Sequence, residues 1–226
     1  MKSHEHLTGS SFVAETKGHT IHSWARYYDL VVGLISLGRE RKFRQAALEL
    51  VDLEPGMQIL DVGCGTGSLT IAAKQKMGND GMVVGIDPSS NMVNLAQEKA
   101  EKQQVEAAFQ VGVIEKIDFP EDHFDLVLSS LMMHHLPNEL KKAGLQEVHR
   151  VLKPGGVLLI IELDPGTLSL ASLIHGHSSQ LSAELENLRR HLECMKFGSV
   201  ESGNLKFKGF SYLKAKKEKP SISLGN

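Results

Sequence analysis

Cysteine, tryptophan and long apolar runs are scarce in this chain of 226 residues. Its 2 cysteines cannot form a disulfide framework, which favours a reducing cytoplasmic location. Apolar runs fall far short of the roughly 20 residues that cross a bilayer, and the first residues lack a secretory signal, so we expect no integral membrane segment. Lys and Arg (25) balance Asp and Glu (27), so we expect no nucleic-acid partner. No Cys/His set has the spacing of a metal site.

The length suits one α/β domain with a small cap. Residues 1–20 are polar and predicted to be loosely ordered, and residues 21–50 repeat apolar side chains at helical spacing, which predicts an N-terminal helical cap. The main domain is expected over residues 51–217, followed by a solvated tail over residues 218–226. The sequence leaves the oligomeric state open.

Short apolar runs alternate with longer amphipathic ones after residue 56. The expected strands are Gln58–Val62, Met82–Ile86, Ala107–Val111, Leu126–Ser129 and Val157–Leu163. The expected helices are Gly67–Met77, Ser89–Gln103, Asn138–Leu152 and Ser178–Cys194. This alternation predicts a parallel sheet, buried on both faces, with helices on each side. Ser199–Lys206 and Phe210–Lys216 have no helix between them, so we expect an antiparallel pair at the end of the sheet.

A glycine-rich loop, Asp61–Gly67 (DVGCGTG), stands between the first expected strand and its helix. Ligands of open α/β sheets bind at the carboxyl ends of strands, and glycines let the backbone approach them closely. A dinucleotide fingerprint fails because Ser68 or Thr70 stands at its third glycine position, and no Gly-Lys-Ser/Thr follows for a Walker loop. The Asp61 carboxylate repels pyrophosphate and favours a ligand that carries an ammonium or sulfonium group.

A second carboxylate, Asp87, ends the next strand 20 residues after Gly67. An acid at this place can accept both hydroxyls of a ribose. Ser89 or Ser90 is expected to cap the following helix, and Met92, one turn into it, is placed to lie against a flat base.

Four segments together resemble the class I S-adenosylmethionine-dependent methyltransferases: Asp61–Gly67, Asp87, Phe124–Ser130 and Leu152–Gly156. The resemblance covers about residues 50–217. It implies a doubly wound, Rossmann-like α/β fold with a seven-stranded sheet of order 3-2-1-4-5-7-6, strand 7 antiparallel, and N-terminal cap helices. It also implies S-adenosyl-L-methionine as cofactor and S-adenosyl-L-homocysteine as product.

The resemblance further implies roles for residues along the crevice. Asp61 would support the amino group of the cofactor's methionine part, and Asp87 would hold its ribose. The methionine part would be bordered by Gly63, Gly65, Thr66, Ser129 and Ser130. Val113 and Ile114 would offer backbone contacts near the adenine, although Val113 stands where the family has an aspartate that holds the adenine amino group.

His134 and His135 follow the fourth expected strand at the mouth of the crevice. Either could remove a proton from a substrate nucleophile as a general base, and the alternative is a polar loop that caps the next helix. The less direct candidates are His175 and His177, in the connection after the fifth strand, and a possible lid of Trp24, Tyr27 and Tyr28, which could equally pack on the domain.

The substrate is predicted only as a class. The step Tyr28-Asp29-Leu30 and the run Ile35–Arg41 resemble the N-terminal helices of the ubiquinone/menaquinone biosynthesis C-methyltransferases, whereas Leu131–Pro137 is similar to general small-molecule methyltransferases. We therefore expect methyl transfer to a small, apolar metabolite, with a quinol as the narrower hypothesis. A non-catalytic cofactor-binding module acting through a partner, and a nicotinamide-dependent dehydrogenase, remain as alternatives.

Overall fold

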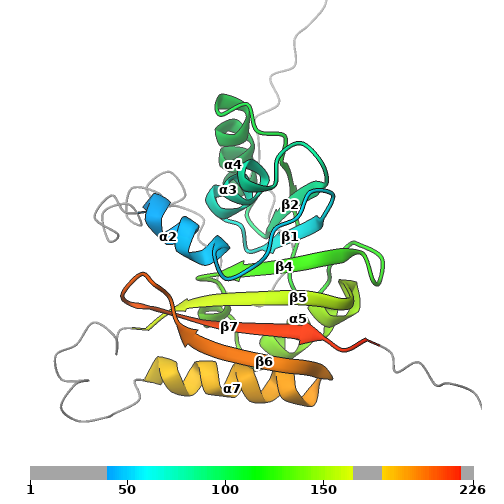
Figure 1. The fold of residues 1–226 in the computed structure, drawn as a ribbon, viewed down its shortest axis with the longest axis vertical. Coiled ribbons are helices and arrows are strands. Elements are labelled where there is room, and N and C mark those ends of the chain that lie inside the picture. The colour runs from blue at the N-terminus through cyan, green and yellow to red at the C-terminus, as the bar shows by residue number, and fades with distance from the viewer. Residues whose placement is uncertain (1–39, 165–179, 220–226) are drawn as a thin grey trace, which may run out of the picture.

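The computed structural model describes residues 40–164 and 180–219 (Figure 1). Its strands are β1 Gln58–Val62, β2 Met82–Asp87, β3 Ala108–Val111, β4 Phe124–Ser130, β5 Leu152–Leu163, β6 Phe197–Asn204 and β7 Phe210–Lys217. Its helices are α2 Glu40–Leu48, α3 Ser68–Met77, α4 Ser90–Lys102, α5 Asn138–Val151 and α7 Gln180–Cys194, with a short 3-10 helix, η1, over Met133–His135. Most of the expected cap, including Trp24, Tyr27 and Tyr28, lies outside the described residues.

The strands form one sheet of 7 strands in the order β3-β2-β1-β4-β5-β7-β6. β1 pairs in parallel with β2 and β4, and the parallel pairing continues to β3 and β5. β7 runs antiparallel to both β5 and β6. The expected strand order and the antiparallel terminal pair are therefore confirmed.

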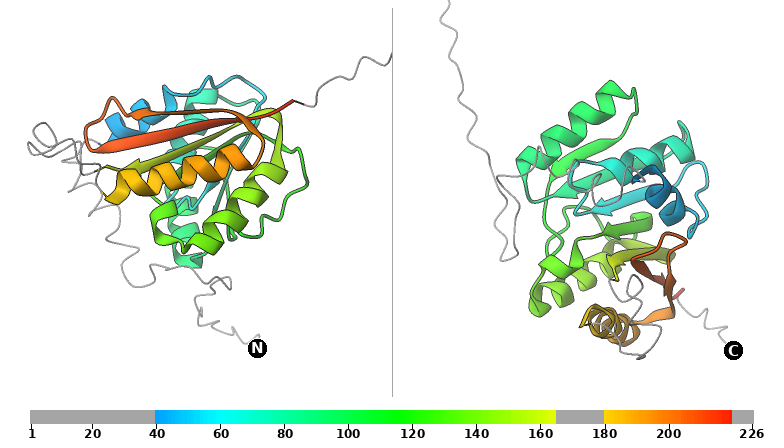
Figure 2. Two further views of the ribbon diagram at one scale, coloured as in Figure 1. Left: turned by 90° about the horizontal axis from the view of Figure 1, so that it is seen from below. Right: turned by 90° about the vertical axis from the view of Figure 1, so that its left-hand side faces the viewer.

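Helices cover both faces of the sheet and bury two separate apolar layers (Figures 1 and 2). On one face α2 and α3 pack against alternate residues of the central strands, such as Ile59 and Leu128. On the other face α5 and α7 pack against the residues between them, such as Leu60 and Val127. Since successive residues of a strand point to opposite faces, near-continuous apolar runs are what this double covering requires.

Two expectations differ from the structure. β3 is an edge strand whose residues alternate between exposed and half-buried, so it is not buried on both faces as predicted. β5 begins at Leu152, five residues before the expected start at Val157, because Leu152 already pairs with Phe124. A register shift follows this pair, and Gly155 within it has a φ of 84°, which explains why the segment reads as a turn in the sequence.

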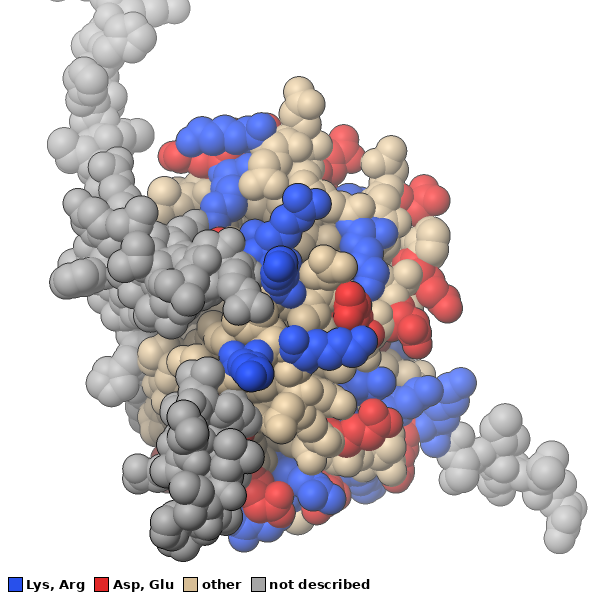
Figure 3. Space-filling view, turned by 60° about the vertical axis from the view of Figure 1, so that its left-hand side comes forward, with Lys and Arg blue, Asp and Glu red and all other residues tan. Residues whose placement is uncertain are grey.

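Charges of both signs occur on the surface. Figure 3 shows one face, on which Lys and Arg side chains are interspersed with Asp and Glu side chains. Several of these charges pair across elements, as Lys206 does with Glu49 at 3.6 Å and Lys214 with Glu201 at 3.7 Å. Among the described residues, no helix combines the length and apolar character needed to cross a membrane.

Candidate active site

The glycine-rich loop curls tightly at the carboxyl end of β1. Gly63, Gly65 and Gly67 all adopt positive φ, at 71°, 53° and 74°, a conformation that glycine adopts without strain. The loop also packs closely on its surroundings, because a Cβ atom on Gly63 would lie 2.3 Å from Cγ of Met132. The backbone N–H of Gly63 donates to the carbonyl of Ile86 at 2.8 Å, which joins the loop to β2.

Asp61 lies at the base of this loop and is only 1% exposed. Its Oδ2 accepts a hydrogen bond from Thr70 Oγ at 2.6 Å, and the backbone N–H of Thr70 donates to the same carboxyl. Thr70 is in the first turn of α3, where backbone N–H groups have no partner within the helix, so Asp61 caps α3 from a neighbouring strand. Burial nevertheless raises the pKa of Asp61 from 3.8 to about 6.

Asp87 ends β2 on the same edge of the sheet and is 9% exposed. Its Oδ2 accepts the backbone N–H of Gly65 at 3.0 Å, and its Oδ1 accepts that of Ser89 at 2.9 Å. Burial raises its pKa, against these two hydrogen bonds. Ser89 occupies the N-cap of α4 as predicted, but its side chain makes no capping hydrogen bond. Asp87 therefore joins the glycine loop to the start of α4.

A pocket opens beside Asp61 and the glycine loop. It is lined by Glu40, Phe43, Arg44, Asp61, Gly63, Cys64, Gly65, Thr66, Ser68, Leu69, Ser130 and Leu131. The pocket thus joins the loop to the end of β4, and it has a wall from α2 that the sequence reasoning did not assign to the site.

Thr66 and Cys64 have clear structural surroundings within this loop. Thr66 Oγ accepts a hydrogen bond from Lys99 Nζ at 2.8 Å, and the same ammonium donates to Ser68 at 2.9 Å, which links the loop to α4. Burial raises the pKa of the Cys64 thiol well above its usual value, and its Sγ faces Gly85, where a Cβ atom would lie 2.8 Å away. The Cys64 thiol is therefore protonated and fills space between the loop and β2.

The end of β4 contributes two serines and a strained residue. Ser130 lines the pocket, whereas Ser129 is buried and its Oγ has no hydrogen-bond partner within the described part of the chain. Leu131 follows with a φ of 57°, a conformation that is uncommon for a residue with a side chain. This turn directs the chain from β4 into η1, where His134 and His135 stand.

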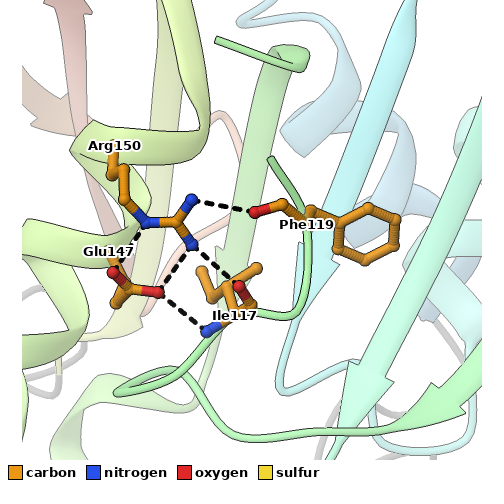
Figure 4. Close-up of polar contacts among 4 residues, drawn as sticks. All are labelled: Ile117, Phe119, Glu147 and Arg150. Carbon is orange, nitrogen blue, oxygen red and sulfur yellow. Dashed lines mark hydrogen bonds and ion pairs between the residues drawn. The ribbon is translucent and has the colours of Figure 1, made fainter. Parts of the chain in front are cut away.

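The connection from β3 to β4 has no helix and is held in place by α5 (Figure 4). Arg150 donates to the carbonyls of Ile117 and Phe119, each at 2.8 Å, and Glu147 accepts the backbone N–H of Ile117 at 3.0 Å. The same Glu147 binds Arg150, which lowers the pKa of Glu147. This clamp fixes the segment that begins with the predicted adenine contacts.

The predicted adenine contacts lie along this segment and α4. Gly112 donates its N–H to the carbonyl of Asp87 at 3.1 Å, which brings the segment next to the end of β2. Val113 is half-buried, while Ile114 and Met92 are 5% and 4% exposed and belong to the apolar interior. Their roles toward a ligand stay predictions. Tyr28, His175 and His177 lie outside the described residues.

Glu162 was not identified from the sequence. It lies near the end of β5, is 3% exposed, and its Oε2 is 2.6 Å from Nδ1 of His134. Its other oxygen accepts the backbone N–H of Met133 at 2.8 Å. The sequence did contain a signal for Glu162, because it is an acid near the end of an apolar strand (LLIIEL). A buried charge at such a place needs a partner.

Comparisons with known proteins agree with this geometry. A family model described as a methyltransferase domain matches residues 59–156. The ubiquinone/menaquinone biosynthesis C-methyltransferase UbiE of Coxiella burnetii is 34% identical over 173 residues, which are 75% of this chain and 68% of that protein. The chain belongs to the class I S-adenosylmethionine-dependent methyltransferases.

Two further relatives extend the comparison for this methyltransferase. The demethylmenaquinone methyltransferase of Bacillus cereus is 33% identical over 142 residues, which are 62% of this chain and 59% of that protein. A SAM-dependent methyltransferase from Aquifex aeolicus superposes with a TM-score of 0.64 at 24% identity, covering 79% of this chain and 92% of that one, and shows the shared fold. The enzyme therefore uses S-adenosylmethionine, and the nicotinamide-dependent alternative is set aside.

Proposed function

We propose that S-adenosylmethionine binds across the loop between Asp61 and Asp87. The support is a pair of buried carboxylates on one sheet edge, 1% and 9% exposed, both with pKa values raised by burial. Such a site favours a ligand whose positive charge and hydroxyl groups compensate the two acids. The glycine loop between them admits a ligand against its backbone.

Asp61 is the proposed partner of the cofactor's ammonium group. Its carboxylate lines the pocket and accepts hydrogen bonds from the side chain and the backbone N–H of Thr70. An ammonium group in contact would supply the positive charge that burial makes favourable. The methionine part of the cofactor would then lie along Gly63, Gly65, Thr66, Ser129 and Ser130.

Asp87 is the proposed partner of the ribose. Each of its oxygens accepts one backbone N–H, and a carboxylate has about four acceptor sites, so both oxygens retain capacity for the two ribose hydroxyls. The adenine would lie between Met92 of α4 and the segment with Val113 and Ile114. Since Val113 has no polar side chain, recognition of the adenine amino group would depend on backbone atoms.

The proposed acceptor is a small, fairly apolar molecule of the quinol type, methylated at carbon. The names of the relatives from Coxiella burnetii and Bacillus cereus support this class. Phe43 and Leu131 give the pocket an apolar side next to its polar loop, as an aromatic acceptor would need. The bound sulfonium supplies an activated methyl group, so the protein's task is to align the acceptor and to exclude water.

A turnover assay tests the proposal. The purified protein is incubated with S-adenosylmethionine and a chemically reduced, short-chain 2-prenyl-1,4-naphthoquinol, and mass spectrometry follows a gain of one methylene mass in the quinol. We expect stoichiometric release of S-adenosylhomocysteine, and a decrease of both signals in Asp87→Ala when S-adenosylmethionine is limiting. Tight cofactor binding without any methylated quinol would refute the acceptor and favour the binding-module alternative.

A further inference from the structure

A buried carboxylate and a histidine meet at the ends of β5 and β4. Glu162 engages both of its oxygens, one with the backbone N–H of Met133 and one with Nδ1 of His134. An ionised carboxylate can only accept hydrogen bonds, so Nδ1 of His134 is the donor in this 2.6 Å contact. In the neutral imidazole the lone pair then resides on Nε2, on the side of the ring away from Glu162.

We propose that Glu162 is a positioning residue that holds His134 as the general base for an acceptor carrying a hydroxyl proton. The inference rests on the proposed function and deepens it. The proton moves from the acceptor oxygen to Nε2 of His134, and the electron pair of the broken O–H bond stays on the oxygen. The buried carboxylate stabilises the imidazolium that forms, as the third group of a catalytic triad does.

The position of His134 relative to the pocket supports this role. The chain that carries it leaves β4 through Ser130 and Leu131, which line the pocket together with Asp61. Met132 then packs against Gly63 of the glycine loop. The side chain of His134 is 26% exposed and that of Glu162 3%, so the imidazole reaches toward solvent while the acid stands behind it.

His134 contacts a carboxylate from β5 and the ring of its neighbour His135. The two rings lie 3.9 Å apart between centroids with an interplanar angle of 45°, so His135 packs beside the proposed base. The titratable side chains in contact with His134 thus include Glu162 from β5 and His135 from η1. The negative charge of Glu162 favours the protonated imidazole, and a protonated His135 would oppose it.

A purely structural role for Glu162, tying η1 to β5, makes a different prediction. In Glu162→Gln the amide oxygen can still accept the N–H of Met133, so the tie between the elements is preserved. The amide NH₂ then faces Nδ1 of His134 and donates to it, which moves the ring proton to Nε2. The variant therefore keeps the structural contact and removes both the charge and the tautomer that a base requires.

Nitrogen NMR of the histidine rings tests the pair without any substrate. The His134 signals are assigned from their loss in His134→Gln, and His191, whose Nδ1 contacts the carbonyl of Asn187 in α7, serves as an internal control. We expect wild-type His134 to carry its proton on Nδ1. In Glu162→Gln the proton moves to Nε2 and the titration midpoint of His134 shifts to lower pH, while His191 is unchanged. Protonation of wild-type His134 on Nε2, or no change in the variant, would overturn the inference.

Kinetics with the reduced naphthoquinol complete the test. We expect His134→Gln and Glu162→Gln to lower kcat by about 10²–10⁴-fold, the usual contribution of a general base, with unchanged affinity for S-adenosylhomocysteine. Added imidazole should partly restore His134→Ala, and His191→Gln should behave as wild type. If neither variant slows product formation, His134 and Glu162 do not act as base and positioning residue. If the wild-type enzyme binds S-adenosylhomocysteine but makes no product, the proposed acceptor is wrong.

Discussion

Replacing Asp61 with asparagine should stabilise the ligand-free protein while weakening its cofactor binding. Burial raises the pKa of Asp61 from 3.8 to about 6, a difference of about 2 pH units. At about 1.4 kcal/mol per unit, the buried charge costs roughly 3 kcal/mol of unfolding free energy above pH 6. Asparagine has the same shape, can still accept from Thr70, and carries no charge.

The pH dependence gives this prediction its sign. Because the folded pKa is raised, the contribution of Asp61 to stability is fully present below pH 3.8 and is lost as the pH rises through about 6. The difference between Asp61→Asn and the wild type should therefore be near zero at pH 4 and reach up to about 3 kcal/mol at pH 8. Urea unfolding of the ligand-free proteins at both values measures it.

Binding should change in the opposite direction. A hydrogen bond to a charged group contributes about 1.5–3 kcal/mol. Asp61→Asn should therefore lower the affinity for S-adenosylhomocysteine by roughly 10- to 150-fold at pH 8. The wild-type affinity should itself fall about tenfold per pH unit below pH 6, because binding an ammonium group requires the ionised acid. Equal stability of both proteins at pH 8, or unchanged affinity in the variant, would refute this account of Asp61.

Two other regions make separate predictions. Gly63→Ala should lower the free energy of unfolding by about 1–3 kcal/mol more than Gly56→Ala does. Both glycines have positive φ, but only at Gly63 would the new methyl group collide with Met132. Equal losses of stability in urea unfolding would contradict the close packing at Gly63. Arg150→Ala should destabilise the protein by about 1–2 kcal/mol and speed hydrogen exchange at Ile117, and unchanged exchange would show that the clamp does not hold the loop.

The parallel core of the fold could be predicted from the sequence because its signals are local. Gln58–Val62 was predicted at its observed bounds, since a buried apolar run ends there at a glycine loop. The strand order implied by the resemblance already placed β3 at the edge, but its exposure was not predicted, because burial of a strand depends on which elements pack against its faces. The start of β5 at Leu152 was not predicted for a related reason. Leu152 pairs with Phe124, a long-range contact, and the glycines of the register shift that follows read as a turn in the sequence.

The site shows the same division between local and long-range information. Asp61 and Asp87 could be identified from their positions at strand ends, and the structure places both at one sheet edge with raised pKa values. Glu162 was missed, because its contact with His134 joins residues 28 positions apart. Asp125 shows that a motif residue can have a structural role instead. It belongs to the motif Phe124–Ser130, but its carboxylate accepts the N–H of Gln58 and the ammonium of Lys153, which are contacts within the fold.

The most direct test of the central claim is a calorimetric titration of S-adenosylhomocysteine into Asp87→Ala. Glu106→Ala, which removes an exposed acid before β3, is the matched control. We predict that Asp87→Ala weakens binding by about 1.5–3 kcal/mol and that the control binds as the wild type does. The loss should largely disappear for an analogue without ribose hydroxyls. Wild-type affinity in Asp87→Ala would contradict the placement of the cofactor at this edge of the sheet.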